Sequence, residues 1–206
     1  MTKKLPRRFY LQDTVTVARA LLGCVLWRRR GRELLAARLV ETEAYLGAND
    51  AASHARRGLR SLRNASMYLE GGHAYVYFTY GMYWCLNVVT QEADIAEAVL
   101  IRAAEPVEGI ESMRRRRPKA KRDSDLLSGP GKLCMAMDID RRLDGEPLDG
   151  DRLFLTARDV AIEESEIAVS PRIGVEGAVD SAHWPLRFFL RGSSFVGGYS
   201  RRYSIR

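Results

Sequence analysis

A run of 21 residues without a formal charge, 71–91, limits what this chain can fold into more than any other feature. Its length would suffice for a transmembrane helix. However, it contains His73, Asn87, four tyrosines and an internal glycine, Gly81, and it lacks the sustained aliphatic character that contact with lipid requires. β-Branched and aromatic residues dominate on both sides of Gly81, so the run predicts two buried strands and no membrane association.

The remaining apolar patterns predict more strands than helices. Strands are expected at 24–28, Glu33–Tyr45, 75–80, 82–90, 98–103, Leu153–Thr156 and 186–191, and helices at 13–22, 107–117 and Pro130–Met137. These helices are too few for a regular βαβ alternation. We therefore expect an α+β fold, with a single domain over residues 1–206 built around a curved antiparallel β-sheet with peripheral helices.

Composition narrows the functional classes. The chain is 46% hydrophobic and 29% charged, which is typical of a globular protein, and its net charge of +7 favours an anionic partner such as nucleic acid. The three cysteines are widely spaced without a CxxC, and no two of the three histidines have metal-ligand spacing, so we expect neither a disulfide framework nor a metal site. The basic N-terminus lacks the apolar stretch of a secretory signal, which predicts a cytoplasmic protein.

Two carboxylates are the first candidates for chemistry. In the strand Glu33–Tyr45, alternation places Leu39, Glu41, Glu43 and Tyr45 on one face. Carboxylates side by side on a strand are costly unless they are solvated, paired or functional, so Glu41 and Glu43 are candidates for acid or base chemistry. The alternative is that both face solvent or pair with some of the 28 arginines.

Aromatic residues form a second cluster, with seven of the 18 in the 17 residues 68–84. Such a cluster offers flat faces for stacking a nucleobase, although an aromatic-rich core is an equally simple interpretation. Tyr80 precedes Gly81 at the expected turn, so it can project from the tip as a wedge.

Arginine is the third feature, because Arg56, Arg57, Arg60 and Arg63 lie in a stretch that has no acid between residues 51 and 69. Guanidinium groups suit phosphate oxygens. A solvated basic face would give the same pattern, and for residues 114–122 we expect a mobile or solvated loop.

Taken together, these motifs resemble the alkyladenine (3-methyladenine, methylpurine) DNA glycosylase family. The resemblance runs from about Phe9 to Val196 and is carried in order by residues 40–47 (VETEAYLG), 50–54 (DAASH), 63–64 (RN), 75–83 (YVYFTYGMY), Asn87, 99–106 (VLIRAAEP), 128–134 (SGPGKLC) and 171–174 (PRIG).

The resemblance implies a role for each matched position. Glu43 would activate the attacking water, Tyr45, His54 and Tyr77 would stack the flipped base, Tyr80 would be the wedge, Asn87 would disfavour guanine, Arg102 would contact the DNA backbone and hold the flipped nucleotide, and Arg63 and Lys132 would bind DNA. Glu41 has no catalytic role in this pattern. No cofactor or metal is implied, and water-based chemistry argues against a Schiff-base step at Lys132.

The implied function is base-excision repair by a monofunctional glycosylase that acts on double-stranded DNA containing damaged purines, as a nucleoid-associated monomer. Two alternatives remain open. A carbohydrate glycosidase would use Glu41 and Glu43 as its carboxylate pair. A nucleic-acid-binding module without catalysis would need only the charge and the aromatic residues.

Overall fold

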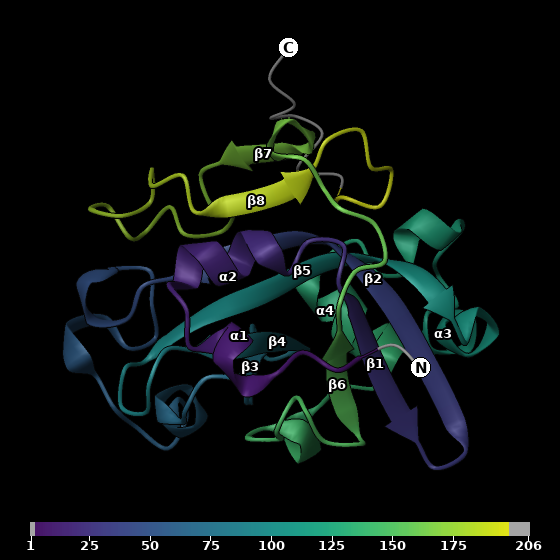
Figure 1. Cartoon of the computed structure of the whole chain (residues 1–206), viewed down its shortest axis with the longest axis horizontal. Coiled ribbons are helices and arrows are strands. Elements are labelled where there is room, and N and C mark those ends of the chain that lie inside the picture. The colour runs from purple at the N-terminus through teal and green to yellow at the C-terminus, as the bar shows by residue number, and fades with distance from the viewer. Residues whose placement is uncertain (1–2, 198–206) are drawn as a thin grey trace.

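The two longest strands, β2 (Glu33–Tyr45) and β5 (Glu97–Glu108), pair with each other and form the centre of the sheet in the computed structural model, which describes residues 3–197. The strand order is β3-β4-β5-β2-β1-β6, and all neighbours in this order are antiparallel. The other strands are β1 (Val25–Arg30), β3 (Ala74–Thr79), β4 (Tyr83–Thr90), β6 (Leu153–Thr156), β7 (Ile167–Ser170) and β8 (Arg187–Leu190). Figure 1 shows the curved sheet with short helices around it, which confirms the predicted α+β class.

Strand β2 pairs with β5 along one edge and with two shorter strands, β1 and β8, along the other. Its N-terminal half pairs with β1, and residues 41–43 pair with β8, which in turn pairs with β7. The uncharged run forms β3 and β4, so the interpretation as sheet is confirmed. In residues 3–197 no helix is long and apolar enough to cross a membrane.

Within residues 3–197, four short α-helices surround the sheet: α1 (Arg7–Tyr10), α2 (Thr14–Ala20), α3 (Ile110–Arg116) and α4 (Pro130–Met137). Asp13 caps α2 by accepting a hydrogen bond from the Thr16 amide at 2.9 Å, and Pro130 opens α4 as predicted. The described part of the chain also has six 3₁₀ turns, η1 to η6, at Gly47–Asn49, Arg56–Gly58, Ala65–Tyr68, Asp123–Asp125, Arg141–Leu143 and Glu164–Glu166.

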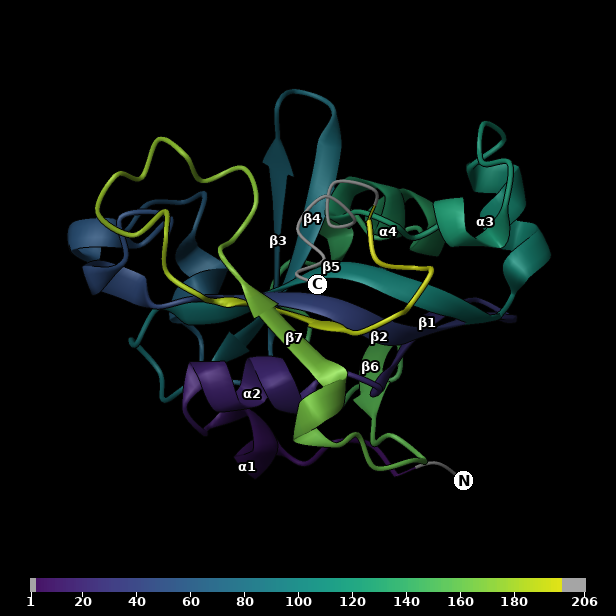
Figure 2. The same ribbon diagram turned by 90° about the horizontal axis from the view of Figure 1, so that it is seen from above.

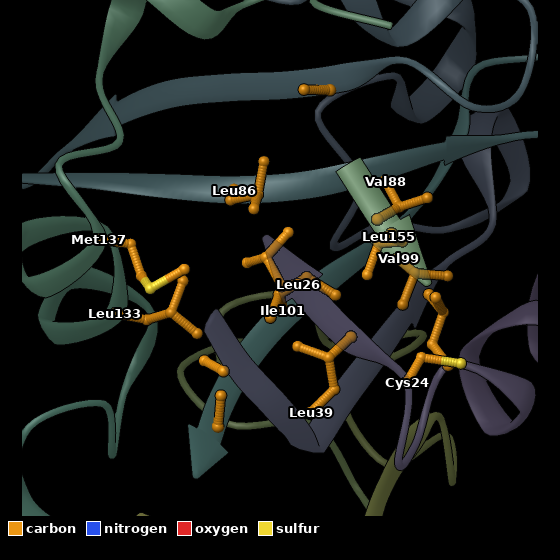
Figure 3. Packing of buried hydrophobic residues seen from close by; sticks show 14 of the residues in the cluster. Cys24, Leu26, Leu39, Leu86, Val88, Val99, Ile101, Leu133, Met137 and Leu155 are labelled. Carbon is orange, nitrogen blue, oxygen red and sulfur yellow. The ribbon is translucent and has the colours of Figure 1, made fainter. Parts of the chain in front are cut away.

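The main hydrophobic core lies where the sheet meets α4 and α2. In Figure 3, Leu39, Leu86 and Ile101 come from three different strands into the same part of the core, and Leu133 and Met137 of α4 lie beside them. All five side chains are fully buried. Dispersion contacts and the loss of water-exposed apolar area at this junction stabilise the packing of the sheet against α4.

The predicted helix over 107–117 is wrong in its first part. Strand β5 continues through Pro106 to Glu108, and its register with β2 shifts between Ala36 and Ala37, where Pro106 pairs with Ala37. A local irregularity accommodates the missing proline amide. The change from strand to helix occurs at Gly109, after the end of β5. A glycine suits this position because its backbone has φ of 74° and an added Cβ would meet Leu35. Helix α1 and strand β7 were not predicted from the sequence.

Candidate active site

A break in the alternation of β2 places Glu41 and Glu43 on the side of the sheet opposite to Leu39. Leu39 packs in the main core, and the Thr42 hydroxyl donates to the Ala18 carbonyl of α2, so these two residues face the same layer although they are three apart. The β2–β5 register is irregular between them, on both sides of Glu41. The prediction that Leu39 shares a face with Glu41 is therefore wrong, whereas Glu41, Glu43 and Tyr45 do lie together.

Glu43 is fully buried, accepts two hydrogen bonds and forms one ion pair. The Tyr45 hydroxyl donates to Oε2 at 3.0 Å, the Ile173 amide donates to Oε1 at 2.8 Å, and the Arg102 Nη1 lies 3.2 Å from Oε1. All three partners are donors, so the carboxylate is bound as an acceptor. The segment around residue 173 thus meets the end of β2 from 130 residues further along the chain.

Glu41 is held by a different set of groups. Its Oε1 accepts from Arg102 Nε at 2.9 Å and from Arg187 Nε at 2.7 Å, and its Oε2 accepts from the Gly197 amide at 3.3 Å. Burial raises the pKa of this carboxyl, but the two guanidinium groups outweigh burial and hold the pKa below its ordinary value. Glu41 is therefore a buried anchor for arginine side chains rather than a second group open to a ligand.

Arg102 connects the two carboxylates. Its side chain, which is 12% exposed, reaches Glu41 with Nε and Glu43 with Nη1. Burial alone would lower the pKa of its guanidinium, and the adjacent Glu43 and Glu41 raise it above the ordinary value. The guanidinium stays charged and crosslinks the two neighbouring strands, because Arg102 is on β5 and both glutamates are on β2.

Aromatic rings line a cavity of about 140 Å³, and one of these residues, Tyr45, also binds Glu43. Its lining includes Tyr45, His54, Tyr77 and Asn87, all of which were predicted to contact a base, together with Ala52, Met67, Tyr75, Thr79, Tyr80, Gly174 and Val175. The His54 ring meets the Tyr77 ring edge-on, with centroids 4.5 Å apart and an interplanar angle of 79°. The two rings therefore contact each other and form adjoining, roughly perpendicular walls of the cavity, each with a flat surface.

Period-2 alternation in β3 and β4 explains these walls. Tyr77 pairs with Cys85 and Tyr75 pairs with Asn87, so all four side chains point to the cavity side, while Val76 and its alternate neighbours pack in the core. Asn87 donates to the Tyr75 carbonyl at 3.1 Å, which fixes its amide at the cavity wall.

His54 is neutral at physiological pH. Burial lowers the pKa of its imidazole to about 4, and the nearby Arg63 and Arg56 add to the effect. Nδ1 lies 2.8 Å from the Tyr75 hydroxyl, and the His54 carbonyl accepts a hydrogen bond from Asn64 at 2.9 Å. The ring can therefore stack and exchange hydrogen bonds, but it carries no proton to give as an acid near pH 7.

A second cavity, of about 370 Å³, adjoins the first and shares Tyr45, Tyr77, Thr79, Tyr80 and Gly174 with it. Arg102, Lys132 and Ile173 are also among its lining residues. Lys132 lies on α4, and its ammonium donates to the Ser128 hydroxyl at 3.2 Å. Three residues of this lining, Tyr45, Arg102 and Ile173, are the groups that bind Glu43, so the carboxylate lies directly behind the wall.

The predicted wedge, Tyr80, projects from the protein. It is 79% exposed, and both Tyr80 and Gly81 have positive φ at the tip of the β3–β4 hairpin, where the Met82 amide donates to the Thr79 carbonyl. Figure 2 shows this hairpin extending away from β2 and β5, on the side opposite α1 and α2. Arg63 donates to the carbonyl of Phe78, two residues before Tyr80, at 3.2 Å.

The structure thus brings together the residues to which the resemblance assigns a role, with Arg63, Tyr80 and Lys132 at the rim and the others at or behind the cavity walls. Arg56, Arg57 and Arg60 line neither cavity, and Arg60 pairs with Asp94. Sequence reasoning gave no role to Ile173, Arg172 or Arg187. The motif at 171–174 was part of the resemblance, so it could have signalled the first two. Within residues 3–197 there is no cluster of His, Cys, Asp or Glu side chains that could hold a metal ion.

Comparison with known proteins identifies the family. A family model described as methylpurine-DNA glycosylase matches residues 8–194, which is most of the chain. The chain belongs to the methylpurine-DNA glycosylase family.

Curated members of the methylpurine-DNA glycosylase family are similar to this chain along nearly their whole length. A protein of Bdellovibrio bacteriovorus is 45% identical over 194 residues, covering 93% of this chain and 97% of the relative. Proteins of Methanocella arvoryzae and Carboxydothermus hydrogenoformans are 47% and 45% identical over 192 residues, with 94% and 97% of the relatives covered. All three are named as candidate 3-methyladenine DNA glycosylases.

Proposed function

We propose that this methylpurine-DNA glycosylase removes damaged purines of the 3-methyladenine, hypoxanthine and ethenoadenine type from duplex DNA. It would flip the nucleotide into the aromatic cavity and hydrolyse the N-glycosidic bond with a water activated by Glu43, leaving an abasic site. The observation that carries the proposal is the position of Glu43, buried behind a flat-walled cavity and bound by Tyr45, Arg102 and Ile173. As a monofunctional hydrolase the enzyme needs no covalent intermediate.

The wedge and the cavity supply the two parts that base flipping requires. Extrusion costs a few kcal/mol of unstacking, which an inserted side chain and a complementary pocket offset. Tyr80 is the exposed side chain at the hairpin tip, and Tyr45, His54 and Tyr77 offer stacking surfaces for the extruded base. Arg63 and Lys132 lie at the rim, where they would meet phosphates of the DNA backbone.

Glu43 would act on water from the side of the larger cavity. Exchange of its hydrogen bond with the Tyr45 hydroxyl for one with water would allow Oε2 to orient the attack on the anomeric carbon, while Arg102 holds Oε1. A carboxylate at this place also stabilises the positive charge that develops on the sugar. For a cationic purine this suffices, since the leaving base is already protonated or alkylated.

A neutral base such as hypoxanthine also needs a proton on its leaving nitrogen. His54 is a poor source of that proton, because the low pKa leaves its imidazole uncharged near pH 7. We therefore propose that His54 stacks and positions the base, and that cationic lesions are released faster than neutral ones. The domain would act as a monomer, with residues 9–196 as its functional core, in the cytoplasm near the nucleoid.

The carbohydrate glycosidase alternative requires two carboxylates open to the same ligand. Glu41 is 1% exposed and its oxygens are occupied by Arg102, Arg187 and the Gly197 amide, which disfavours that reading.

The test compares wild type with Glu43→Gln on duplex oligonucleotides that carry hypoxanthine or 1,N6-ethenoadenine and on methylated DNA, followed by alkaline cleavage of abasic sites. We expect Glu43→Gln to lose at least about a hundredfold in rate while it still binds DNA. Glu105 lies on β5 and pairs with Arg38 of β2 near the surface. Glu105→Gln is the matched control and should behave like wild type. DNA binding without base release by wild type would favour the non-catalytic module instead.

A further inference from the structure

The ring of Tyr45 has a cation behind it. The guanidinium carbon of Arg172 lies 4.6 Å from the centre of the Tyr45 ring. Tyr45 is in the lining of both cavities, and Arg172 is in the described lining of neither. The guanidinium therefore covers the side of the ring that is turned away from a ligand in the cavities.

This guanidinium is fixed in place. Its side chain is fully buried, as is that of Asp50, and two hydrogen bonds of 2.5 and 2.8 Å join them. Arg172 also donates to the Ala44 carbonyl at 2.9 Å, next to Tyr45 in the chain. Asp50 in turn accepts from the Ser181 hydroxyl at 2.8 Å. A buried charge with this many partners cannot turn away from the ring when a ligand binds.

A cation on one face of an aromatic ring affects what the other face binds. The π-electrons of a tyrosine attract cations, and two cations on opposite faces compete for the same electron density and repel each other. A neutral purine stacks largely through dispersion and loss of water-exposed area, which a distant charge changes little. Asp50, the buried partner of Arg172, offsets part of the positive charge of the guanidinium.

We propose that Arg172 is a positioning residue that acts through Tyr45 and weakens the preference of the site for cationic purines, so that neutral lesions remain substrates. This inference rests on the proposed function, because it assumes that Tyr45 stacks the flipped base. It concerns the balance between two classes of lesion rather than the ability to release either.

The test uses the double variant Arg172→Gln/Asp50→Asn, which removes both charges and keeps polar groups at both positions. Single-turnover rates are measured for release of 3-methyladenine from methylated DNA and of hypoxanthine from a duplex oligonucleotide. We expect the ratio of the cationic to the neutral substrate to rise about threefold above the wild-type ratio, a change in the range of one weak cation–π contact. A merely structural role would lower both rates by the same factor.

Asp50→Asn alone provides a test of opposite sign. It removes the carboxylate and leaves the guanidinium, so the ratio should fall below that of wild type, and this variant carries the test if the double variant does not fold. Arg172→Lys keeps the positive charge and should leave the ratio unchanged. An unchanged ratio in a folded charge-removing variant would overturn the inference. Absence of release by wild type from both substrates would count against the proposed function instead.

Discussion

Two regions of this protein are rich in arginine and use it in opposite ways. Around Glu41, the side chains of Arg102 and Arg187 are 12% and 0% exposed and share one carboxylate. In and after α3, Arg114 and Arg122 pair with acids on the surface, and their side chains are 49% and 66% exposed. The same type of ion pair, between an arginine and an acid, therefore fixes the positions of the side chains in the first region and remains largely solvated in the second.

Desolvation explains the difference. A buried guanidinium that loses its partner keeps the full penalty of an uncompensated charge, whereas an exposed one regains water. The prediction that residues 114–122 form a mobile or solvated loop is wrong in its first part, because residues 114–116 belong to α3 and Arg116 pairs with Glu33 with its side chain only 18% exposed. The exposed pairs of Arg114 and Arg122 agree with it. The number of arginines near an acid says little about stability until their burial is known.

The largest expected effect is loss of stability on breaking the buried group. Arg187→Ala leaves Glu41 with one guanidinium fewer and removes the hydrogen bond to Ser170, so the free energy of unfolding should fall by about 3–5 kcal/mol. Urea denaturation measures this. Arg191→Ala, at an exposed position just after β8, is the control. Equal losses in the two variants would break the distinction between buried and exposed arginine.

A hydrophobic replacement of the pair sharpens the same comparison. Glu41→Leu/Arg187→Met removes both charges, so it should recover much of the stability lost in Arg187→Ala. The rate of base release by this double variant should nevertheless stay below that of wild type, because Arg102 loses the carboxylate that anchors its Nε. Recovery of both properties would mean that Glu41 does not position Arg102.

The next effect concerns pH. Burial, aided by Arg63 and Arg56, lowers the pKa of His54 from 6.5 to about 4, so between these values the unfolded chain binds a proton that the folded chain does not. The contribution of His54 is therefore complete above pH 6.5 and is lost as the pH falls toward 4, by up to about 3 kcal/mol. Denaturation of wild type and His54→Gln across this range measures it. Parallel pH profiles for the two proteins would refute it.

A smaller effect is expected at the hairpin tip. Tyr80→Ala should leave the unfolding midpoint unchanged, because the side chain is 79% exposed, and should slow release of hypoxanthine from duplex DNA by about tenfold. Release from single-stranded DNA should change less, since no base pair has to be opened. Equal slowing on both substrates would argue that Tyr80 contacts the base itself.

The smallest effect is expected in the exposed region. Arg114→Ala removes pairs with Glu111 and Asp123 that lie on the surface, so neither the urea midpoint nor the rate of base release should change measurably. A clear loss of stability would show that the exposed arginines form a cooperative network.

Much of the site could be predicted from sequence because strands repeat every two residues. Alternation correctly grouped Glu41 with Glu43 and Tyr45, and Tyr80 next to Gly81 correctly indicated an exposed turn. Alternation predicted the wrong face for Leu39, because the pattern cannot reveal an irregularity in strand pairing after which the side chains switch faces. It failed at Pro106 for a similar reason, since a proline within a strand depends on its pairing partner.

By itself, then, the sequence determined most of the local choices: most of the strands, most of the side chains that share a face, and the motifs that resemble a glycosylase and single out Glu43. Only the tertiary structure decided the surroundings of the two glutamates, with Glu41 as an anchor for arginine side chains and Glu43 behind the cavity wall. Arg187 and the amide of Ile173 reach β2 from more than 120 residues away, and they set the environment of each carboxylate. Alternation treats Glu41 and Glu43 alike, whereas burial, donors and charges depend on contacts that no local pattern contains.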